Sequence, residues 1–147
     1  MTTDVNALFI DTNVLIYGTI IESPQHQKAR DALNTAIQHD RSLWISRQVL
    51  REYIATMTRP QNFQIPLDKK TVVQRIEFFQ TQFNIADDSQ QTTDYLLELI
   101  QQIEIGGKQI HDANIVATMM ANDVTCLLTH NTVDFRRFEH LIRIETI

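Results

Sequence analysis

The chain has 147 residues, the length of one domain with one hydrophobic core, and we expect a single domain over residues 1–147. Hydrophobic residues make up 43% of the chain and charged residues 21%, with only three Gly and three Pro, a composition that excludes a disordered or linker-rich protein. No apolar run approaches the roughly 18 residues of a membrane span, and residues 1–20 lack a basic stretch followed by an apolar one, so we expect no membrane association and a cytoplasmic protein.

The first predicted elements share one feature, a short apolar strand that ends in polar residues. Residues 7–10 (ALFI) predict a buried strand, which ends at Asp11, and residues 12–18 predict a short helix. Ser23 and Pro24 predict the start of a second helix, because proline at the first helical position lacks only an N–H that would be unpaired there. The core face of this helix is expected to contain Ala29, Leu33, Ala36 and Ile37.

The next strand and helix are predicted around Ser46. Residues 43–45 predict a short strand, and Ser46 is expected to cap a helix that runs to about Met57. On this helix the buried stripe contains Val49, Leu50, Tyr53, Ile54 and Met57, and Glu52 lies at its border. Glu52 is therefore placed either to reach a cleft or to form a boundary salt bridge with Arg51, Arg59 or another segment.

The second half of the chain continues the alternation of helices and strands. After a loop at 61–66, helices are predicted from Asp68 to about residue 82, from Asp88 (with Gln91 as a capping box) to the glycines at 106–107, and over residues 110–121. Strands are predicted at residues 83–86, 124–129 and 142–145, and a short helical piece at 136–141. This alternation predicts an α/β fold with three α/β/α layers, in which helices flank a central, mostly parallel sheet.

Charge and cysteine content set two further bounds. The formal net charge of −5 argues against a broad basic surface for nucleic acid, although four carboxylates in one metal site would leave only −1 on the rest. Positive charge gathers in the middle third, as a solvated helix face or an RNA contact surface: Arg47, Arg51, Arg59, Lys69, Lys70 and Arg75. The lone cysteine, Cys126, lies in an apolar run and is expected to be a small core residue.

Four carboxylates stand at positions where a cleft is expected. Asp11 follows one strand, Asp134 follows another, Asp112 lies in the first turn of a buried helix, and Glu52 borders an apolar stripe. Strand ends of a parallel sheet share one edge, and carboxylates gathered there repel one another unless a cation or a proton joins them. Oxygen ligands without histidine or cysteine favour Mg²⁺ or Mn²⁺, which support nuclease chemistry. Helix capping is the alternative role for Asp11, Thr12 and Asp112.

Four segments in this order and spacing resemble PIN-domain ribonucleases, and among them VapC-like toxins of type II toxin–antitoxin pairs. They are residues 9–15 (FIDTNVL), 46–52 (SRQVLRE), 111–117 (HDANIVA) and 128–135 (LTHNTVDF). The resemblance implies a PIN-like fold around a parallel sheet and Mg²⁺-dependent endoribonuclease activity on an RNA substrate. It also implies a homodimer and inhibition by a cognate antitoxin that covers the site.

The resemblance also assigns roles to single residues. Asp11 and Asp112 would be the principal metal ligands and Glu52 a further ligand or water-orienting base, and the fourth catalytic and metal-binding position falls on Asp134 or Asn131, of which Asp134 carries the charge. Substrate-binding roles fall on the polar residues beside them: Thr12, Asn13, Thr129 and Asn131.

Two other function classes are compatible with parts of this pattern. A PIN fold with a degraded site would be a non-catalytic RNA-binding or partner-binding module, and the ambiguity between Asn131 and Asp134 is what suggests it. A phosphotransfer receiver or aspartyl-phosphate phosphatase would use Asp11 as its nucleophile. That class needs an acidic pair beside the aspartate, and the residues after Asp11 are Thr12 and Asn13.

Overall fold

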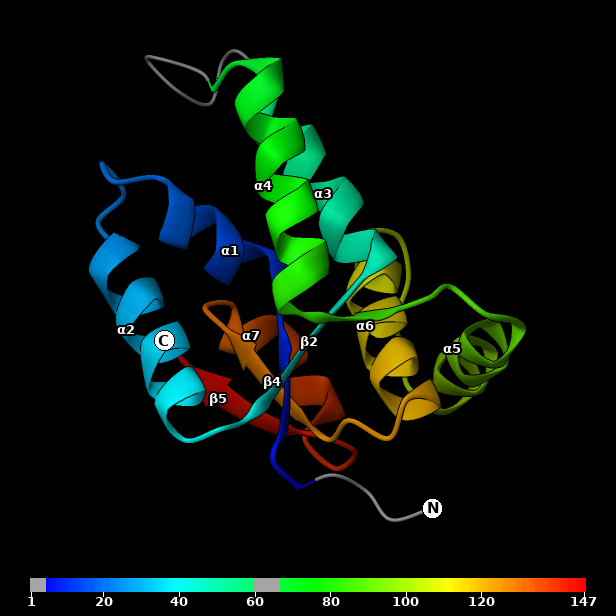
Figure 1. The fold of residues 1–147 in the computed structure, drawn as a ribbon. Coiled ribbons are helices and arrows are strands. Elements are labelled where there is room, and N and C mark those ends of the chain that lie inside the picture. Colours follow the sequence, from blue (N-terminus) through cyan, green and yellow to red (C-terminus); the bar gives the residue numbers. More distant parts are fainter. Residues whose placement is uncertain (1–4, 60–66) are drawn as a thin grey trace.

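The computed structural model describes residues 5–59 and 67–147, and within them five strands form one parallel sheet (Figure 1). The strands are β1 (Ala7–Ile10), β2 (Ser42–Ser46), β3 (Asn84–Ala86), β4 (Cys126–Thr129) and β5 (Arg143–Thr146). Their order across the sheet is β3-β2-β1-β4-β5, and every neighbouring pair is parallel. The predicted parallel sheet is confirmed.

Helices cover both faces of this sheet. They are α1 (Thr12–Thr19), α2 (His26–Gln38), α3 (Arg47–Met57), α4 (Lys69–Gln82), α5 (Gln90–Gln102), α6 (Gln109–Ala121) and α7 (Thr132–Phe135), followed by the 3₁₀ turn η2 (Arg136–Phe138). The chain runs from β1 outward to β3 and then crosses back to β4, and right-handed crossovers therefore place α1–α4 on one face and α5–α7 on the other. Accordingly, α1 packs against α2 and α3, while α5 packs on the outer side of α6 (Figure 1). This is the predicted α/β/α fold.

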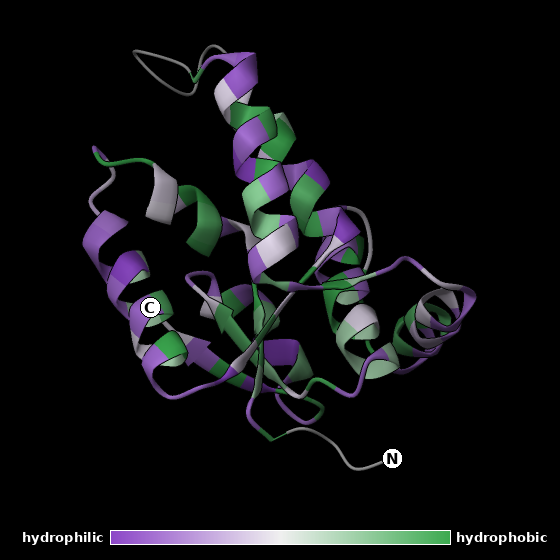
Figure 2. Ribbon diagram, in the orientation of Figure 1, coloured by the Kyte–Doolittle hydropathy of each residue, from purple (hydrophilic) through white to green (hydrophobic). Residues whose placement is uncertain are grey.

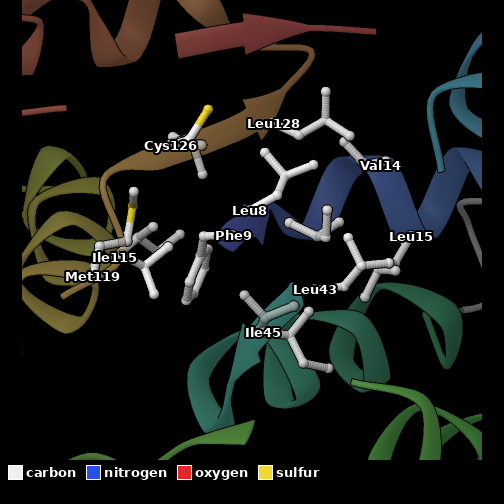
Figure 3. Packing of buried hydrophobic residues seen from close by; sticks show 14 of the residues in the cluster. Leu8, Phe9, Val14, Leu15, Leu43, Ile45, Ile115, Met119, Cys126 and Leu128 are labelled. Atoms are coloured by element: carbon white, nitrogen blue, oxygen red, sulfur yellow. The ribbon is translucent and has the colours of Figure 1, made fainter. Parts of the chain in front are cut away.

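The core lies between the sheet and its two helical layers. Every residue of β1 and β4 is buried, which explains why both strands are continuous apolar runs rather than alternating ones. Phe9 of β1 faces Ile115 and Met119 of α6 (Figure 3), and all three side chains are buried. Hydrophobic residues predominate in β1 and β4, whereas α2 and β5 are largely hydrophilic (Figure 2).

Two predicted helix starts are confirmed, and the predicted start of α2 is wrong. Ser46 accepts a hydrogen bond from Val49 N, and Asp68 accepts one from Thr71 N, each at the start of its helix. Helix α2 begins at His26 instead of Pro24, because the Ser23 hydroxyl accepts from Gln25 N and holds this segment in a turn. The predicted loop at 61–66 lies outside the described residues.

The predicted ends of α5 also need correction. Its N-cap is Ser89, whose hydroxyl accepts from Thr92 N, whereas Asp88 forms an ion pair with Arg51 at 3.1 Å. The helix ends at Gln102, ahead of the glycines at 106–107, because Ile103 adopts an extended conformation. The short helical piece near the C-terminus likewise begins at residue 132 instead of 136.

Three isoleucines expected on buried stripes lie at the edges of those stripes and reach solvent. Ile37 and Ile54 are 59% and 39% exposed, and Ile100, which the spacing of the apolar residues 95–103 also places on an inward face, is 41% exposed. Cys126 is buried as expected, and its thiol donates a hydrogen bond to Glu145. No helix within residues 5–59 and 67–147 has the length and apolarity needed to cross a membrane.

Candidate active site

The centre of the sheet is a switch point in its topology. After β1 the chain continues to β2 on one side of β1, and after β4 it continues to β5 on the other side of β4. The connections that leave the two neighbouring strands β1 and β4 therefore run in opposite directions. Ligands of parallel α/β folds bind at such a point, beyond the carboxyl ends of the strands. Asp11 follows β1 there and Thr129 ends β4, and Asp11 N donates to Leu128 O at 3.0 Å.

Asp11 is buried and hydrogen-bonded through both carboxylate oxygens. Oδ1 accepts from Thr12 N at 2.8 Å, so Asp11 does cap α1, as the capping alternative proposed. Oδ2 accepts from Asn13 Nδ2 at 3.0 Å and from Thr129 Oγ1 at 2.8 Å. A residue that only capped α1 would not need the bond from Thr129, which joins Asp11 to β4.

Burial dominates the electrostatics of Asp11. Loss of solvation raises the pKa of its carboxyl group to about 6, although the bonds from Thr129, Thr12 and Asn13 act in the opposite direction. The negative charge of Glu52 adds to the rise. The Asp11 carboxylate is therefore less stable than a free one, and a cation beside it would favour the charged form.

Glu52 lies beside Asp11 at the border of the core, as predicted. Its Oε1 accepts from Thr12 Oγ1 at 3.2 Å and more weakly from Gln48 Nε2 at 3.5 Å. The alternative of a boundary salt bridge is not what the structure contains, because Arg51 pairs with Asp88 and Glu52 forms no ion pair among the described residues. Oε2 accepts no hydrogen bond from the described part of the chain and is available to a ligand.

Asp112 and Asp134 complete the acidic cluster. Asp112 lies half-buried in the first turn of α6, and Asp134 lies exposed in the first turn of α7. Partial burial, followed by the negative charges of Asp11, Asp134 and Glu52, raises the pKa of Asp112 to about 6. Arg137 acts in the opposite direction. The four carboxylates named from the sequence thus interact electrostatically in the folded chain.

The types of donor atom at this site favour a bound metal ion, whereas the distances between the side chains do not. All four side chains offer carboxylate oxygens, the donors that Mg²⁺ and Mn²⁺ prefer, and their mutual repulsion favours a shared cation. However, no three acidic, histidine or cysteine side chains within the described ranges already stand close enough together to hold one. The chemistry of the site fits a divalent cation, whereas the present spacing of the carboxylates does not yet form a complete set of ligands.

The remaining predicted residues surround Asp11. Asn13 Nδ2 also donates to Thr129 Oγ1 at 3.3 Å, and Asn13 Oδ1 accepts from His130 N at 3.0 Å. Thr129 is fully buried and accepts from Asn131 N at 3.0 Å, whereas the Asn131 side chain is exposed. Substrate contact by Thr12, Asn13, Thr129 and Asn131 stays a prediction, and the burial of Thr129 favours a role in holding Asp11.

Comparison with known proteins identifies the family. The family model described as "PIN domain" matches residues 8–141, nearly the whole chain. The chain belongs to the PIN domain family. The resemblance found in the sequence is thereby confirmed.

Relatives and solved structures agree with this membership. The chain is 24% identical over 131 residues to Ribonuclease VapC48 of Mycobacterium tuberculosis, covering 88% of this chain and 90% of the relative. A toxin–antitoxin complex from Klebsiella pneumoniae contains a chain that is 27% identical with a TM-score of 0.60, covering 88% of this PIN domain and 89% of that chain. VapBC-1 from nontypeable Haemophilus influenzae gives a TM-score of 0.68 at 18% identity, with 95% and 97% coverage.

Two residues near the acidic cluster were missed at the sequence level. Gln48 is buried one helical turn before Glu52 on α3, and that spacing is the signal that could have revealed it. Arg137 follows the predicted Asp134 by three residues and acts on Asp112, a signal that depends on the fold of α7 and η2. Neither residue carries a role in the resemblance.

A cavity in the described part of this PIN domain lies away from the acidic cluster. It has a volume of about 540 Å³ and is lined by residues of α1, α2, α4 and β2. Its walls combine apolar side chains, including Leu33, Ile37 and Phe78, with the arginines Arg30 and Arg75. Ile37 and Phe78 are 59% and 51% exposed, so the cavity opens as a groove with apolar rims.

Proposed function

We propose that this PIN domain is a Mg²⁺-dependent endoribonuclease, with Mn²⁺ as an alternative ion, and the toxin of a toxin–antitoxin pair. The observation that carries the proposal is the electrostatic coupling of Asp112 to Asp11, Glu52 and Asp134 at the switch point of the sheet. The relative named Ribonuclease VapC48 supports RNA as the substrate class. We further propose that these four carboxylates are the catalytic and metal-binding residues.

The hydrogen bonds assign different tasks to the carboxylates. Asp11 is held through both oxygens and would supply the fixed ligand, while Asp112 and Asp134 would turn toward it. A divalent ion bound there would activate a water molecule and neutralise the negative charge that develops on the phosphate. Glu52 Oε2 would accept the proton of the attacking water, because Oε1 is already occupied by the Thr12 and Gln48 bonds.

Cleavage of a structured RNA tests the activity. We expect cuts in the presence of Mg²⁺ or Mn²⁺ and none with EDTA, because the carboxylates alone repel the phosphate. Tight RNA binding without cleavage in either ion would contradict the enzyme. It would favour the alternative of a PIN fold retained as an RNA-binding module.

Glu52→Gln is expected to weaken Mn²⁺ binding by about 10-fold or more while the metal-free protein keeps its stability, because Glu52 borders the core without filling it. Isothermal titration gives the affinity, and thermal melting in EDTA gives the stability. Glu77→Gln is the matched control, since Glu77 is an exposed carboxylate on α4. A loss of more than a few degrees of melting temperature in EDTA would show that Glu52 is instead a structural residue.

We propose that a cognate antitoxin binds this chain and covers the acidic cluster, and that the groove between α2 and α4 receives one segment of it. The toxin–antitoxin complexes among the similar structures support a protein partner. The groove combines exposed apolar side chains with Arg30 and Arg75, which suits an amphipathic segment carrying acidic residues. We also propose that the chain forms a homodimer, which sedimentation of the purified protein would test.

Phe78→Glu is expected to weaken the binding of the antitoxin by at least about 10-fold, because a carboxylate would enter an apolar contact. The probe is the product of the reading frame beside the gene for this chain, co-expressed with the tagged protein. Leu97→Glu on α5 is the control, since Leu97 is 52% exposed and Phe78 is 51% exposed. If Phe78→Glu weakened antitoxin binding no more than Leu97→Glu does, the antitoxin would bind outside this groove.

A further inference from the structure

Every polar atom of the Gln48 amide group is hydrogen-bonded, mainly between α3 and α6. Gln48 lies on α3 and is only 6% exposed. Its Nε2 donates to His111 O at 2.9 Å and, more weakly, to Glu52 Oε1 at 3.5 Å, while its Oε1 accepts from Asn114 Nδ2 at 2.8 Å. Both N–H groups and the carbonyl of the amide are therefore satisfied inside the protein.

The hydrogen-bond partners of this amide include one proposed metal ligand, Glu52, and lie near another, Asp112. His111 O belongs to the peptide group that joins His111 to Asp112, so the 2.9 Å bond holds the backbone from which the Asp112 side chain leaves. Asn114 lies two residues beyond Asp112 on the same helix. The same amide nitrogen contacts Glu52. One buried side chain thus joins the backbone of one candidate ligand to the carboxylate of another.

A purely structural account explains this amide less well. Burying an amide is unfavourable unless every polar atom is paired, and a long side chain loses rotamer entropy when it is fixed. The neighbouring positions Val49 and Leu50 fill the core with apolar side chains. A methionine of similar length would pack at position 48 without these requirements.

We propose that Gln48 is a positioning residue that sets the distance and orientation between Glu52 and Asp112, and so determines the affinity of the site for its divalent ion. This proposal rests on the proposed function. Groups that orient metal ligands through hydrogen bonds typically change metal affinity by about 10–100-fold when they are removed.

The test compares Mn²⁺ binding to the full chain and its variants by electron paramagnetic resonance, with RNA cleavage measured in parallel. Gln48→Met is expected to weaken Mn²⁺ binding by about 10-fold or more. Saturating Mn²⁺ should restore most of the cleavage rate, because no group that touches the substrate has been removed. Asn114→Ala removes one support of the amide and should weaken binding less, and it carries the test if Gln48→Met fails to fold.

Thr92→Val is the control for loss of a buried hydrogen bond. Thr92 is 1% exposed on α5, and its hydroxyl bonds to Ser89. The Thr92→Val variant should have a lower melting temperature than the wild type and an unchanged affinity for Mn²⁺. Unchanged affinity in Gln48→Met, with an active wild-type chain, would overturn the positioning role and leave the nuclease proposal intact. A wild-type chain that neither binds Mn²⁺ nor cleaves RNA would overturn both.

Discussion

Asp112→Asn is expected to reduce RNA cleavage by about 10³-fold or more if Asp112 is the metal ligand proposed above, since loss of such a ligand removes several kcal/mol of transition-state stabilisation. The same change should stabilise the metal-free protein at pH 7. Asp112 accepts no hydrogen bond from the described residues, and burial followed by the charges of three carboxylates raises its pKa. The shift to about 6 is worth about 1–2 kcal/mol after allowance for the half-exposed position of the side chain. The melting temperature should therefore rise by about 3–6 °C.

The gain in stability should depend on pH in a definite direction. Because the pKa of Asp112 is higher in the folded chain than the usual 3.8, the folded state holds its proton more strongly between about pH 4 and pH 6. Wild-type stability from this group therefore falls as the pH rises through that window. The difference between Asp112→Asn and wild type should be small at pH 4 and complete at pH 7.

Melting curves in EDTA from pH 4 to pH 7 measure this difference, and added Mg²⁺ should stabilise the wild type more than the variant. Asp94→Asn on α5 controls for the general loss of one negative charge, because Asp94 is exposed. An Asp112→Asn protein that melts below the wild type at pH 7 would show that burial and repulsion of the Asp112 charge do not destabilise the metal-free fold. Retained cleavage would remove Asp112 from the catalytic residues.

The elements that were predictable from the sequence are those whose signals are local. The apolar runs of β1 and β4 are buried on both faces, and their burial follows from composition alone. The start of α5 was not predictable in this way, because Asp88 and Ser89 are both good N-caps. The choice between them depends on Arg51, which lies 37 residues away in sequence and pairs with Asp88.

In the candidate site, too, some residues could be predicted from local sequence and others depend on contacts between distant segments. Asp11 and Asp112 could be named because a strand end and a buried helix start each place a carboxylate near the core. The bond from Thr129 to Asp11 spans 118 residues and depends on β4 lying beside β1, an adjacency that periodicity does not reveal. The Gln48 contacts likewise depend on how α3 meets α6. Residues that hold the ligands are therefore harder to predict than the ligands.

Thr129→Val is expected to lower the free energy of unfolding by about 2 kcal/mol at pH 7, because it removes a buried hydrogen bond to a carboxylate. The melting temperature should fall by about 4–8 °C. Thr129 is fully buried, and its hydroxyl donates to Asp11 Oδ2 at 2.8 Å. This bond lowers the pKa of Asp11 more than any other group does, so valine should raise that pKa further above 6.

The pH dependence separates the lost bond from simple repacking. The bond stabilises the ionised form of Asp11, so its contribution is present above the folded pKa and is lost as the pH falls through it. The deficit of Thr129→Val should therefore be larger at pH 7 than at pH 4. Thr129→Ser keeps the hydroxyl and loses only a methyl group, which predicts a deficit of about 1 kcal/mol that does not change with pH. A deficit of equal size at both pH values in the valine variant would mean that Thr129 supports the fold without acting on the charge of Asp11.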